Sequence, residues 1–496
     1  YVMASLLAEF AGKIDLIYID PPFATGADFS VKMEIGDAEW TKEPSAIEDK
    51  AYRDTWGRGL DSYLQMIYER LVLMRELLSD KGSIYVHLDW RVGHYVKIVL
   101  DEIFSKEHFV NEIIWTYEDI GSRDVNFFKR KHDVLYMYEK TSKRTFNTIL
   151  KGLSESTIKR FGSYFDKNGH ITYKWLKENN PGVFAKLKGI PDNLDTPWLD
   201  ISKGQPLADW WSGISPLKSH FNEALGYDTQ KPEALLENVI KASSNEGDLV
   251  ADFFPGSGTT GAVAEKLGRR WIMADLGRFA IHTTRKRLLG IEGCKPFVVQ
   301  NLGKYERQYW QGVTFKKHSD EQIPLYEYIQ FILRLYNAEP LAGMLHVHGR
   351  KGKRLIHIGA VDAPVTFAEI QEAVAETKKT GQDSLDILGW EWEMGLHDVV
   401  EKAAKASGVH LRLFSIPRDV MDQRAVEKGE ITFYELAYLE VETLQDKVGR
   451  IVVALKDFAI PNLDLIPQEV RKIVKKWSDY IDYWAVDWDW NEDTFH

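Results

Sequence analysis

The chain has 496 residues, of which 44% are hydrophobic and 12% aromatic, so it can bury the cores of two or three globular domains. Its net charge of −11 argues against a protein that coats nucleic acid over its whole surface, and no stretch approaches the roughly 18–20 uninterrupted apolar residues of a membrane span. The single cysteine, Cys294, excludes an internal disulfide framework and a thiolate zinc cluster. No signal peptide is visible, and we expect a cytoplasmic protein without a metal centre.

The first predicted element is a buried strand over the β-branched run at residues 14–19. Pro21 and Pro22 prevent further ladder pairing, so Asp20 lies at the carboxyl end of that strand, where open α/β sheets bind ligands. The Asp20 carboxylate and the rigid proline carbonyls offer only acceptors, which suits an exocyclic amino group with two N–H donors. Phe23 adds a flat face on which a base can stack. Taken alone, the stretch also fits a strand followed by a Pro-Pro turn.

Helices and strands then alternate along the chain. We expect a helix over residues 61–78 that Lys81-Gly82 ends, a strand at 83–88, a helix at 92–104, and strands near 112–116 and 133–138. This alternation predicts an α/β fold with a mostly parallel, doubly wound sheet.

Residues 141–225 break this rhythm, because they are basic, polar and rich in Gly, Asn and Trp, and they predict an inserted module rather than sheet core. Residues 121–220 hold 17 basic and 10 acidic side chains, an excess that attracts a phosphate backbone. A solvated basic face is the alternative. The candidate DNA-binding residues that lead into the module are Arg123, Lys129, Arg130 and Lys131.

The α/β rhythm returns with helices at 233–243, 259–267 and 278–289 and strands at 248–254, 271–275 and 297–300. Gly256 and Gly258 follow a strand, let a ligand approach backbone N–H groups, and precede Thr259 or Thr260 as a helix cap. Asp275 ends the next strand, where an acidic side chain typically accepts from ribose hydroxyls. These features indicate an adenosine-containing cofactor without specifying which one.

A nicotinamide cofactor is the competing interpretation. It explains neither the Asp-Pro-Pro-Phe stretch nor the Thr229–Pro232 segment before the helix at 233–243. That segment supplies hydroxyl, amide and ammonium groups that can hold a carboxylate, as an amino-acid-bearing cofactor requires. A helix cap with a surface lysine is the alternative for this segment.

The C-terminal part, from about Lys316, predicts a second α/β pattern with strands at 354–359, 410–414 and 451–455 and helices at 367–377 and 396–406. The acids of Asp386–Glu393 have the spacing of a nuclease core, but Met394 stands where that core needs a lysine. We therefore interpret the match as accidental and expect an interaction or DNA-handling domain.

Taken together, the chain resembles the amino-methylating DNA methyltransferases that use S-adenosylmethionine. The matching stretches are Asp20–Phe23, Thr229–Pro232 and Asp252–Thr260. The catalytic motif precedes the cofactor loop, an order similar to that of the β group, which includes the modification (Mod) subunits of type III restriction systems. The resemblance covers roughly residues 10–300 and implies a Rossmann-like methyltransferase sheet.

The resemblance also implies roles for individual residues. Asp20 and the Pro21 carbonyl, supported by Pro22, would hold the amino group of a base flipped out of double-stranded DNA, and Phe23 would stack on that base. The residues implied to contact the cofactor are Thr229, Gln230, Lys231, Asp252, Phe254, Gly256, Ser257, Gly258, Thr259, Thr260 and Asp275.

This chain departs from the family pattern at two places. Pro255 stands where a small residue is more usual, and the acidic motif that usually precedes the catalytic strand would lie upstream of Tyr1. We expect a methyltransferase domain in two halves, 1–140 (catalytic) and 226–315 (cofactor-binding), a target-recognition region at 141–225 and a C-terminal α/β domain at 316–496.

The sequence therefore predicts a site-specific adenine-N6 DNA methyltransferase, since Asp before Pro-Pro favours adenine. Two alternatives stay open: an N4-cytosine enzyme, and a non-catalytic DNA-binding subunit of a restriction-modification or phage-defence system. The resemblance implies two kinds of protein partner. These are other subunits of such a system and a second copy of this chain.

Overall fold

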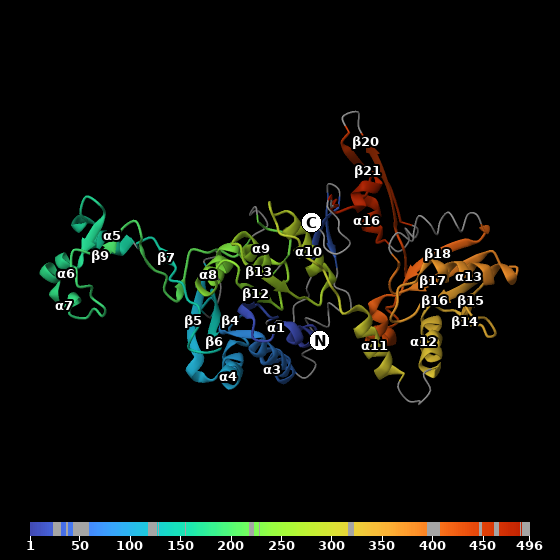
Figure 1. Cartoon of the computed structure of the whole chain (residues 1–496), viewed down its shortest axis with the longest axis horizontal. Coiled ribbons are helices and arrows are strands. Elements are labelled where there is room, and N and C mark those ends of the chain that lie inside the picture. Colours follow the sequence, from blue (N-terminus) through green and yellow to red (C-terminus); the bar gives the residue numbers. More distant parts are fainter. Residues whose placement is uncertain are drawn as a thin grey trace. The chain divides into compact units, whose positions relative to one another are not determined.

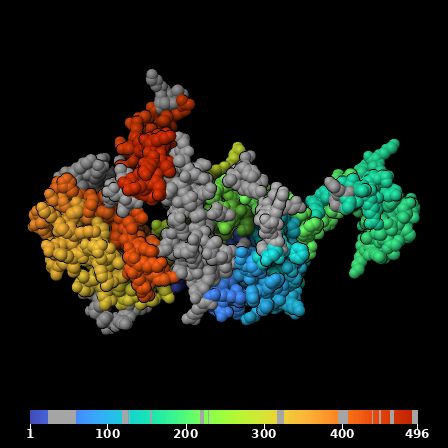
Figure 2. Space-filling model, turned by 180° about the vertical axis from the view of Figure 1, so that it is seen from behind, coloured from blue at the N-terminus to red at the C-terminus, as the bar shows by residue number. Residues whose placement is uncertain are grey.

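The computed structural model describes residues 1–22, 31–35, 38–42, 59–117, 126, 128–153, 155–217, 223–227, 229–315, 322–393, 407–445, 449–460, 466–486 and 488. It divides into two compact units, one of Tyr1–Asp28 with Lys50–Lys295 and one of Phe29–Asp49 with Pro296–His496. The elements are coloured along the chain in Figure 1 and keep those colours in the space-filling view of Figure 2. None of the described helices is long and apolar enough to cross a membrane.

The first unit is built on a seven-stranded sheet in the order β11-β5-β6-β4-β1-β12-β13. The strands are β1 (Ile14–Ile19), β4 (Leu78–Leu88), β5 (Phe109–Thr116), β6 (His132–Glu139), β11 (Trp210–Trp211), β12 (Leu249–Asp252) and β13 (Arg270–Met273). Neighbours pair in parallel except at β6, which is antiparallel to both β4 and β5. The chain leaves β1 toward β4 on one side and returns as β12 on the other. The sequence prediction of a mostly parallel, doubly wound Rossmann-like sheet is confirmed.

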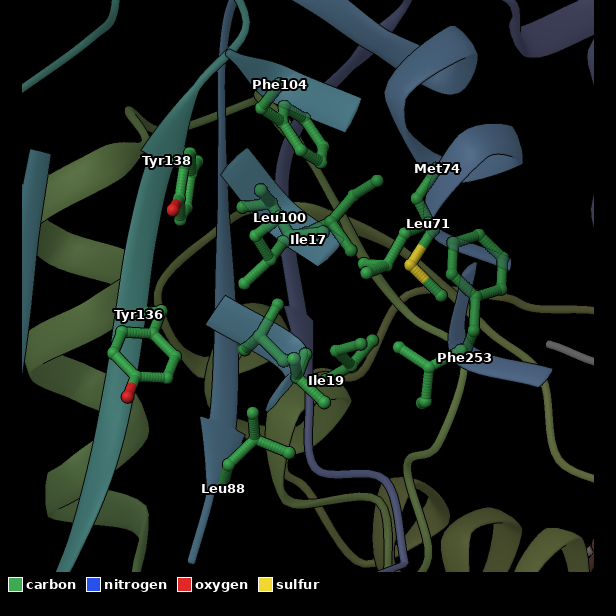
Figure 3. Close-up of a cluster of buried hydrophobic side chains, with 14 of the residues drawn as sticks. Ile17, Ile19, Leu71, Met74, Leu88, Leu100, Phe104, Tyr136, Tyr138 and Phe253 are labelled. Atoms are coloured by element: carbon green, nitrogen blue, oxygen red, sulfur yellow. The ribbon is translucent and has the colours of Figure 1, made fainter. Parts of the chain in front are cut away.

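Helices cover both faces of this sheet, because neighbouring side chains of a strand point to opposite faces. The helices are α1 (Val2–Phe10), α3 (Leu60–Leu77), α4 (Gly93–Phe104), α8 (Glu233–Ser243), α9 (Thr259–Lys266) and α10 (Arg278–Leu289). Ile17 and Ile19 pack with Leu71 of α3 and Phe104 of α4 (Figure 3). Tyr18, which alternates with them, lies in the core that α8 and α9 cover. Each such fully buried aliphatic side chain contributes roughly 1.5–3 kcal/mol.

The boundary between α3 and β4 differs from the sequence prediction. The helix ends at Leu77 rather than at Lys81-Gly82, because Leu78 already pairs with Ile14 before a bulge shifts the register. Gly82 belongs to this bulge, where a Cβ would lie 2.9 Å from the Ile14 carbonyl oxygen. The glycine therefore permits a close backbone approach and does not cap the helix.

Two further expectations at the sheet edges are wrong. Residues 297–300 do not join the sheet as a last strand, and Val298 and Val299 stay about half exposed. Trp210 and Trp211, expected in a separate module, pair with β5 as the edge strand β11. Trp211 is buried with Trp115, so the sheet gains an apolar edge from the end of the predicted insertion.

The rest of the predicted recognition region folds into short elements. These are β7 (Leu150–Lys151), α5 (Glu155–Phe161), β8 (His170–Thr172), α6 (Tyr173–Asn179), α7 (Pro181–Phe184), β9 (Pro197–Asp200) and β10 (Gln205–Pro206). The strands form two-stranded antiparallel pairs, β7 with β10 and β8 with β9. These elements are coloured teal to green in Figure 1.

The second unit contains a six-stranded sheet in the order β14-β15-β16-β17-β18-β19, together with two separate hairpins. The sheet strands are β14 (Glu339–Pro340), β15 (Gly349–Lys351), β16 (Arg354–Ile358), β17 (Ser384–Gly389), β18 (His410–Ser415) and β19 (Tyr434–Glu435). The hairpins are β2 (Val31–Ile35) with β3 (Ala38–Lys42) and β20 (Tyr438–Gln445) with β21 (Ile451–Ala459). The helices are α11 (Gly303–Thr314), α12 (Gln322–Leu335), α13 (Phe367–Lys379), α15 (Gln423–Lys428) and α16 (Gln468–Ile473).

The second unit begins before residue 316, because Trp310 of α11 packs on Phe315, Tyr328 and Phe331. The predicted strand at 451–455 exists, but it belongs to the β20–β21 hairpin rather than to the sheet. The predicted helix at 396–406 lies outside the described residues.

Candidate active site

Three acidic residues lie at one edge of the first unit's sheet. Asp20 directly follows β1, Asp252 ends β12, and Asp275 comes two residues after β13. Because these strands are parallel neighbours, their carboxyl ends meet at the same edge, which is the ligand-binding edge of doubly wound folds. The two predicted halves of the site, catalytic and cofactor-binding, are therefore brought together around β1 and β12.

The Asp20 carboxylate forms an ion pair, through Oδ2, with the ammonium group of Lys231. Each of the two side chains is only 14% exposed. The other carboxylate oxygen, Oδ1, is buried and has no hydrogen-bond partner in the part of the chain that the structure describes. Pro21 beside it is buried and Pro22 is half-buried, whereas Phe23 lies outside the described residues. Asp20 therefore has one oxygen held by a cation and one buried oxygen able to accept a donor.

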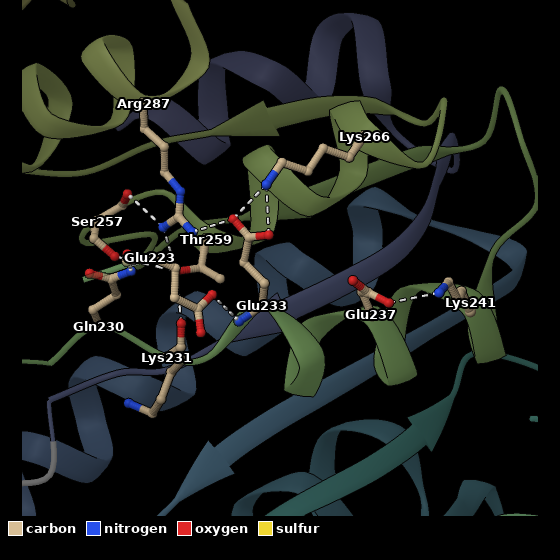
Figure 4. A network of polar contacts seen from close by, with 10 residues as sticks. All are labelled: Glu223, Gln230, Lys231, Glu233, Glu237, Lys241, Ser257, Thr259, Lys266 and Arg287. Carbon is tan, nitrogen blue, oxygen red and sulfur yellow. Dashed lines mark hydrogen bonds and ion pairs between the residues drawn. The ribbon is translucent and has the colours of Figure 1, made fainter. Parts of the chain in front are cut away.

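The segment that carries Lys231 is fixed on both sides (Figure 4). The Gln230 side chain donates to the Glu223 carbonyl at 2.6 Å and accepts from the Leu225 N–H at 2.8 Å. Thr259 Oγ1 donates to the Lys231 carbonyl at 3.1 Å, which joins this segment to the glycine loop. Thr229, the remaining predicted residue, is exposed.

A network of ion pairs and hydrogen bonds behind the loop at residues 256–258 was not predicted from the sequence. Arg287 of α10 donates to Thr259 Oγ1 at 2.9 Å and to Glu233 at 2.8 Å, and Lys266 donates to Glu233 at 2.7 Å (Figure 4). Burial alone would raise the pKa of Glu233, but Lys266 and Arg287 more than offset it and hold that pKa below its usual range. The network ties α8, α9 and α10 together behind the loop.

The glycine loop has the turns that the sequence predicts, but the N-cap of α9 is Gly258 rather than Thr259 or Thr260. Gly256 has φ +51° and Gly258 φ +75°, in the left-handed region that favours glycine. A Cβ at Gly258 would lie 2.5 Å from Thr284 Oγ1. Asp275 accepts from the Gly256 N–H at 3.1 Å and from the Gly277 N–H at 2.8 Å, so this carboxylate holds the loop.

Asp252 is buried at the end of β12. Its carboxylate accepts from the Phe254 N–H at 2.8 Å and from Thr260 Oγ1 at 2.6 Å. Burial raises the pKa of Asp252 to about 7, with the charges of Asp20 and Asp275 adding to the rise and the two donors opposing it. Ser257, between the two loop glycines, is also buried, and its carbonyl faces Arg287.

A buried polar chain reaches the same edge from β1, β4 and β6. The Tyr18 hydroxyl and His87 Nδ1 share a hydrogen bond of 2.8 Å, and burial and nearby carboxylates raise the pKa of Tyr18 far above its usual value. The other ring nitrogen of His87 then donates to Asp133 at 3.4 Å, and Tyr117 donates to the same carboxylate at 3.4 Å. Although burial alone would raise it, the pKa of Asp133 is lowered by His87, Lys231 and Tyr117.

His132, the first residue of β6, is exposed, and its neighbour Asp133 carries the interactions. Because β6 is antiparallel to β4, its first residues lie at the carboxyl edge of β4, and no local sequence pattern reports this pairing.

The predicted DNA-binding residues lie around an exposed tryptophan. Trp90 follows β4 and is 42% exposed, and the Arg130 guanidinium carbon lies 3.8 Å and that of Arg91 4.8 Å from its ring centroid. Lys129 is exposed and Lys131 half-buried. Cations stacked on an aromatic ring at a strand end are suited to phosphate contact. Arg123 lies outside the described residues.

The nuclease-like acids of the second unit have structural partners. Both oxygens of the buried Asp386 bond to Arg354 or Arg412, Glu391 pairs with Arg307, and Glu393 accepts from the Phe367 N–H. Among the residues that the structure describes, no group of His, Cys, Asp and Glu could hold a metal ion.

The sequence was also compared with families and individual proteins that are already known. A family model described as DNA methylase matches residues 14–286. Type II methyltransferase M.EcaI of Enterobacter cloacae is 31% identical over 311 residues, covering 55% of this chain and 64% of that protein. The StyLTI Mod subunit, a type III restriction-modification enzyme of Salmonella typhimurium, is 28% identical over 324 residues, covering 52% of this chain and 47% of that protein.

DNA adenine methyltransferase YhdJ of Escherichia coli is also similar, at 27% identity over 287 residues, covering 58% of this chain and 80% of that protein. This chain thus spans about half to two thirds of the length of M.EcaI and of the StyLTI Mod subunit. The family match covers more than half of the chain and contains the whole edge at which Asp20, Lys231, Asp252 and Asp275 meet. This chain belongs to the DNA methylase family, as a β-group amino-methyltransferase.

Proposed function

We propose that this chain transfers a methyl group from S-adenosylmethionine to the N6 amino group of adenine in DNA. The observation that carries the proposal is the Asp20 carboxylate, with one buried oxygen that has no partner among the described residues, directly ahead of two prolines. The Asp that precedes Pro-Pro and the similarity to a DNA adenine methyltransferase support adenine as the target.

On the target side, Asp20 Oδ1 and the Pro21 carbonyl would accept the two N–H groups of the amino group. This interaction orients the nitrogen, and the Asp20 charge stabilises the positive charge that develops on it as the new N–C bond forms. The Asp20 side chain is only 14% exposed, so a base inside a duplex cannot reach it. The target base must therefore be flipped out of double-stranded DNA.

On the cofactor side, the residues present fit S-adenosylmethionine. Gly256 and Gly258 give the loop its left-handed turns and let Tyr227 and Thr284 pack against it, and Asp275 stands at the position for ribose hydroxyls. Asp252, Phe254, Ser257, Thr259 and Thr260 shape the loop, and Thr229 and Gln230 border it. When bound, the cofactor supplies an electrophilic methyl group on a sulfonium sulfur.

On the DNA side, Lys129, Arg130 and Lys131 would contact phosphates beside the pocket, and residues 141–225 would recognise the target sequence. Similarity to a type III Mod subunit supports a place in a restriction-modification system, in which a restriction subunit and a second copy of this chain are the expected partners.

The proposal is tested by incubating the chain with methyl-labelled S-adenosylmethionine and mixed-sequence DNA and analysing the nucleosides by mass. N6-methyladenine is expected; N4-methylcytosine would keep the chemistry and change the base. Absence of any methylated nucleoside, with DNA binding retained, would contradict the enzyme and favour a DNA-binding subunit.

Asp20→Ala is the first variant to measure. We expect methyl transfer to fall by at least about 1,000-fold, because a carboxylate that stabilises developing charge is removed, while cofactor affinity changes less than about three-fold. Asp61→Ala, at an exposed position in the first turn of α3, is the matched control and should keep full activity. An equal loss of cofactor binding in Asp20→Ala would contradict the role given to Asp20.

A further inference from the structure

We infer that Lys231 is a positioning residue for the target-binding carboxylate of Asp20, rather than a ligand for the carboxylate of the cofactor. The inference rests on the proposed function and assigns Lys231 to the target side of the same site. Its starting point is the ion pair between the Lys231 ammonium group and Asp20 Oδ2, formed by residues 211 positions apart in the chain.

The backbone of Lys231 is fixed on both sides. Thr259 holds the Lys231 carbonyl at 3.1 Å, and Pro232 follows with φ −62° as the N-cap of α8. Gln230, on the other side, is buried and bonded through both ends of its amide. The Lys231 side chain therefore extends toward Asp20 from a defined backbone position, and the ion pair holds the ammonium group at its end.

The ion pair selects which oxygen of Asp20 meets the target. Lys231 occupies Oδ2, and Oδ1 is buried without a partner among the described residues. A carboxylate held by one oxygen cannot rotate to present either oxygen at random. Lys231 therefore presents Oδ1 to an amino N–H of the base, and the charge-assisted bond is strong because both side chains are largely enclosed.

The charge of Lys231 reaches beyond its ion pair with Asp20. Together with His87 and Tyr117, it lowers the pKa of Asp133 against the effect of burial. Removing the Lys231 charge therefore takes a favourable partner from Asp133 as well as from Asp20.

The first test is a double-mutant cycle on thermal unfolding of the whole chain without cofactor or DNA. Lys231→Met leaves the enclosed Asp20 carboxylate unpaired, so we expect Tm to fall by about 4–8 °C. Asp20→Asn in the Lys231→Met background should recover most of that loss. Lys241→Met removes an exposed i,i+4 pair with Glu237 on α8 and is the matched control, with a Tm change below about 1 °C. Additive effects of the two site substitutions would overturn the inference.

The second test separates the two roles by cofactor binding. S-adenosylhomocysteine and its decarboxylated analogue are titrated calorimetrically into the parent chain and into Lys231→Met. We expect Lys231→Met to change either affinity by less than about three-fold. A loss above about ten-fold for the carboxylate-bearing ligand, absent for the decarboxylated one, would assign Lys231 to the cofactor and overturn the inference.

The third test measures kcat and KM separately for the parent chain and for Lys231→Met. Lys231→Met should lower kcat at least about 100-fold with the KM for S-adenosylmethionine unchanged, and a raised KM with unchanged kcat would contradict positioning. The unfolding cycle and the calorimetry need no turnover. If the parent chain methylates no DNA, the proposed function fails while these two tests still decide the role of Lys231.

Discussion

Two aspartates at the edge of one sheet differ in protonation because their surroundings differ. Asp133 accepts from His87 and Tyr117 and lies near the Lys231 ammonium group, which together hold its pKa below its usual range against the effect of burial. Asp252 has only neutral donors, Thr260 and the Phe254 N–H, and burial raises its pKa to about 7. One carboxyl is thus kept charged, and the other titrates near neutrality.

The raised pKa of Asp252 predicts a pH-dependent stability. Its pKa is about 7 in the folded chain, against about 3.9 when unfolded, so the folded chain binds this proton more tightly. Its stabilising contribution is complete below about pH 4 and is lost as the pH rises through 7. We expect Asp252→Asn, which stays neutral, to lose about 3–8 °C less in Tm than the parent between pH 5 and pH 8. Calorimetric scans at both pH values measure this; parallel changes in the two proteins would argue against it.

At the scale of the elements, the antiparallel direction of β6 determines which residues lie at the edge of the sheet that carries Asp20. In a sheet of parallel strands only the residues that leave each strand reach its carboxyl edge. Because β6 is antiparallel to β4, the residues that enter it, Lys129–Asp133, reach this edge as well. They meet Trp90 and Arg91, which leave β4. A basic surface is thereby formed at the edge of the sheet that also carries Asp20.

DNA binding at this surface predicts a dependence on salt. Arg130→Ala should lower the slope of log K against log salt concentration by about 0.9, as expected for one lost phosphate contact. Trp90→Ala should weaken binding several-fold because Arg130 and Arg91 lose the ring on which they stack, and Trp90→Phe should recover part of it. Lys106→Ala, exposed before β5 at the opposite edge, is the control. Equal slopes for the parent and Arg130→Ala in fluorescence-anisotropy titrations would remove Arg130 from the interface.

How far the sequence predicts the elements depends on how local their signal is. The helix over 278–289 and the strands β1 and β12 follow from apolar periodicity and from Pro or Gly at their ends, and the structure has them within a few residues. The edge strand β11 has only two residues, and the early start of β4 at Leu78 depends on pairing with Ile14. Neither has a local pattern, so neither could be predicted.

The site shows the same limit. Asp20 directly follows β1 and Asp252 ends β12, as the sequence predicts, because strand ends are visible in sequence. It predicted neither the ion pair of Asp20 with Lys231 nor the contact of His87 with Asp133. Both join segments that are distant in the chain, and periodicity reports the faces of an element but not which distant ends meet.

At the scale of the whole molecule, each unit has its own apolar cores, with Leu71 buried in one and Ile387 in the other. We therefore expect two thermal transitions. Leu71→Ala should lower one and Ile387→Ala the other, each by about 5–15 °C for a loss of roughly 2–5 kcal/mol. S-adenosylhomocysteine should raise only the transition that Leu71→Ala lowers. If both substitutions lowered one shared transition in a calorimetric scan, the units would not unfold independently.

The insertion of β1 between β4 and β12 has a practical consequence for protein engineering. Asp20 and Asp133 precede residues 141–225, whereas Lys231, Asp252 and Asp275 follow them. A break within that region would give two polypeptides, each with an incomplete site and with one of the paired strands β1 and β12. Reassembly of such fragments would depend on β1 entering the sheet beside β12. Given the proposed activity, a cut in this region would make a split methyltransferase, and methylated DNA would report that two proteins fused to the fragments had come into contact.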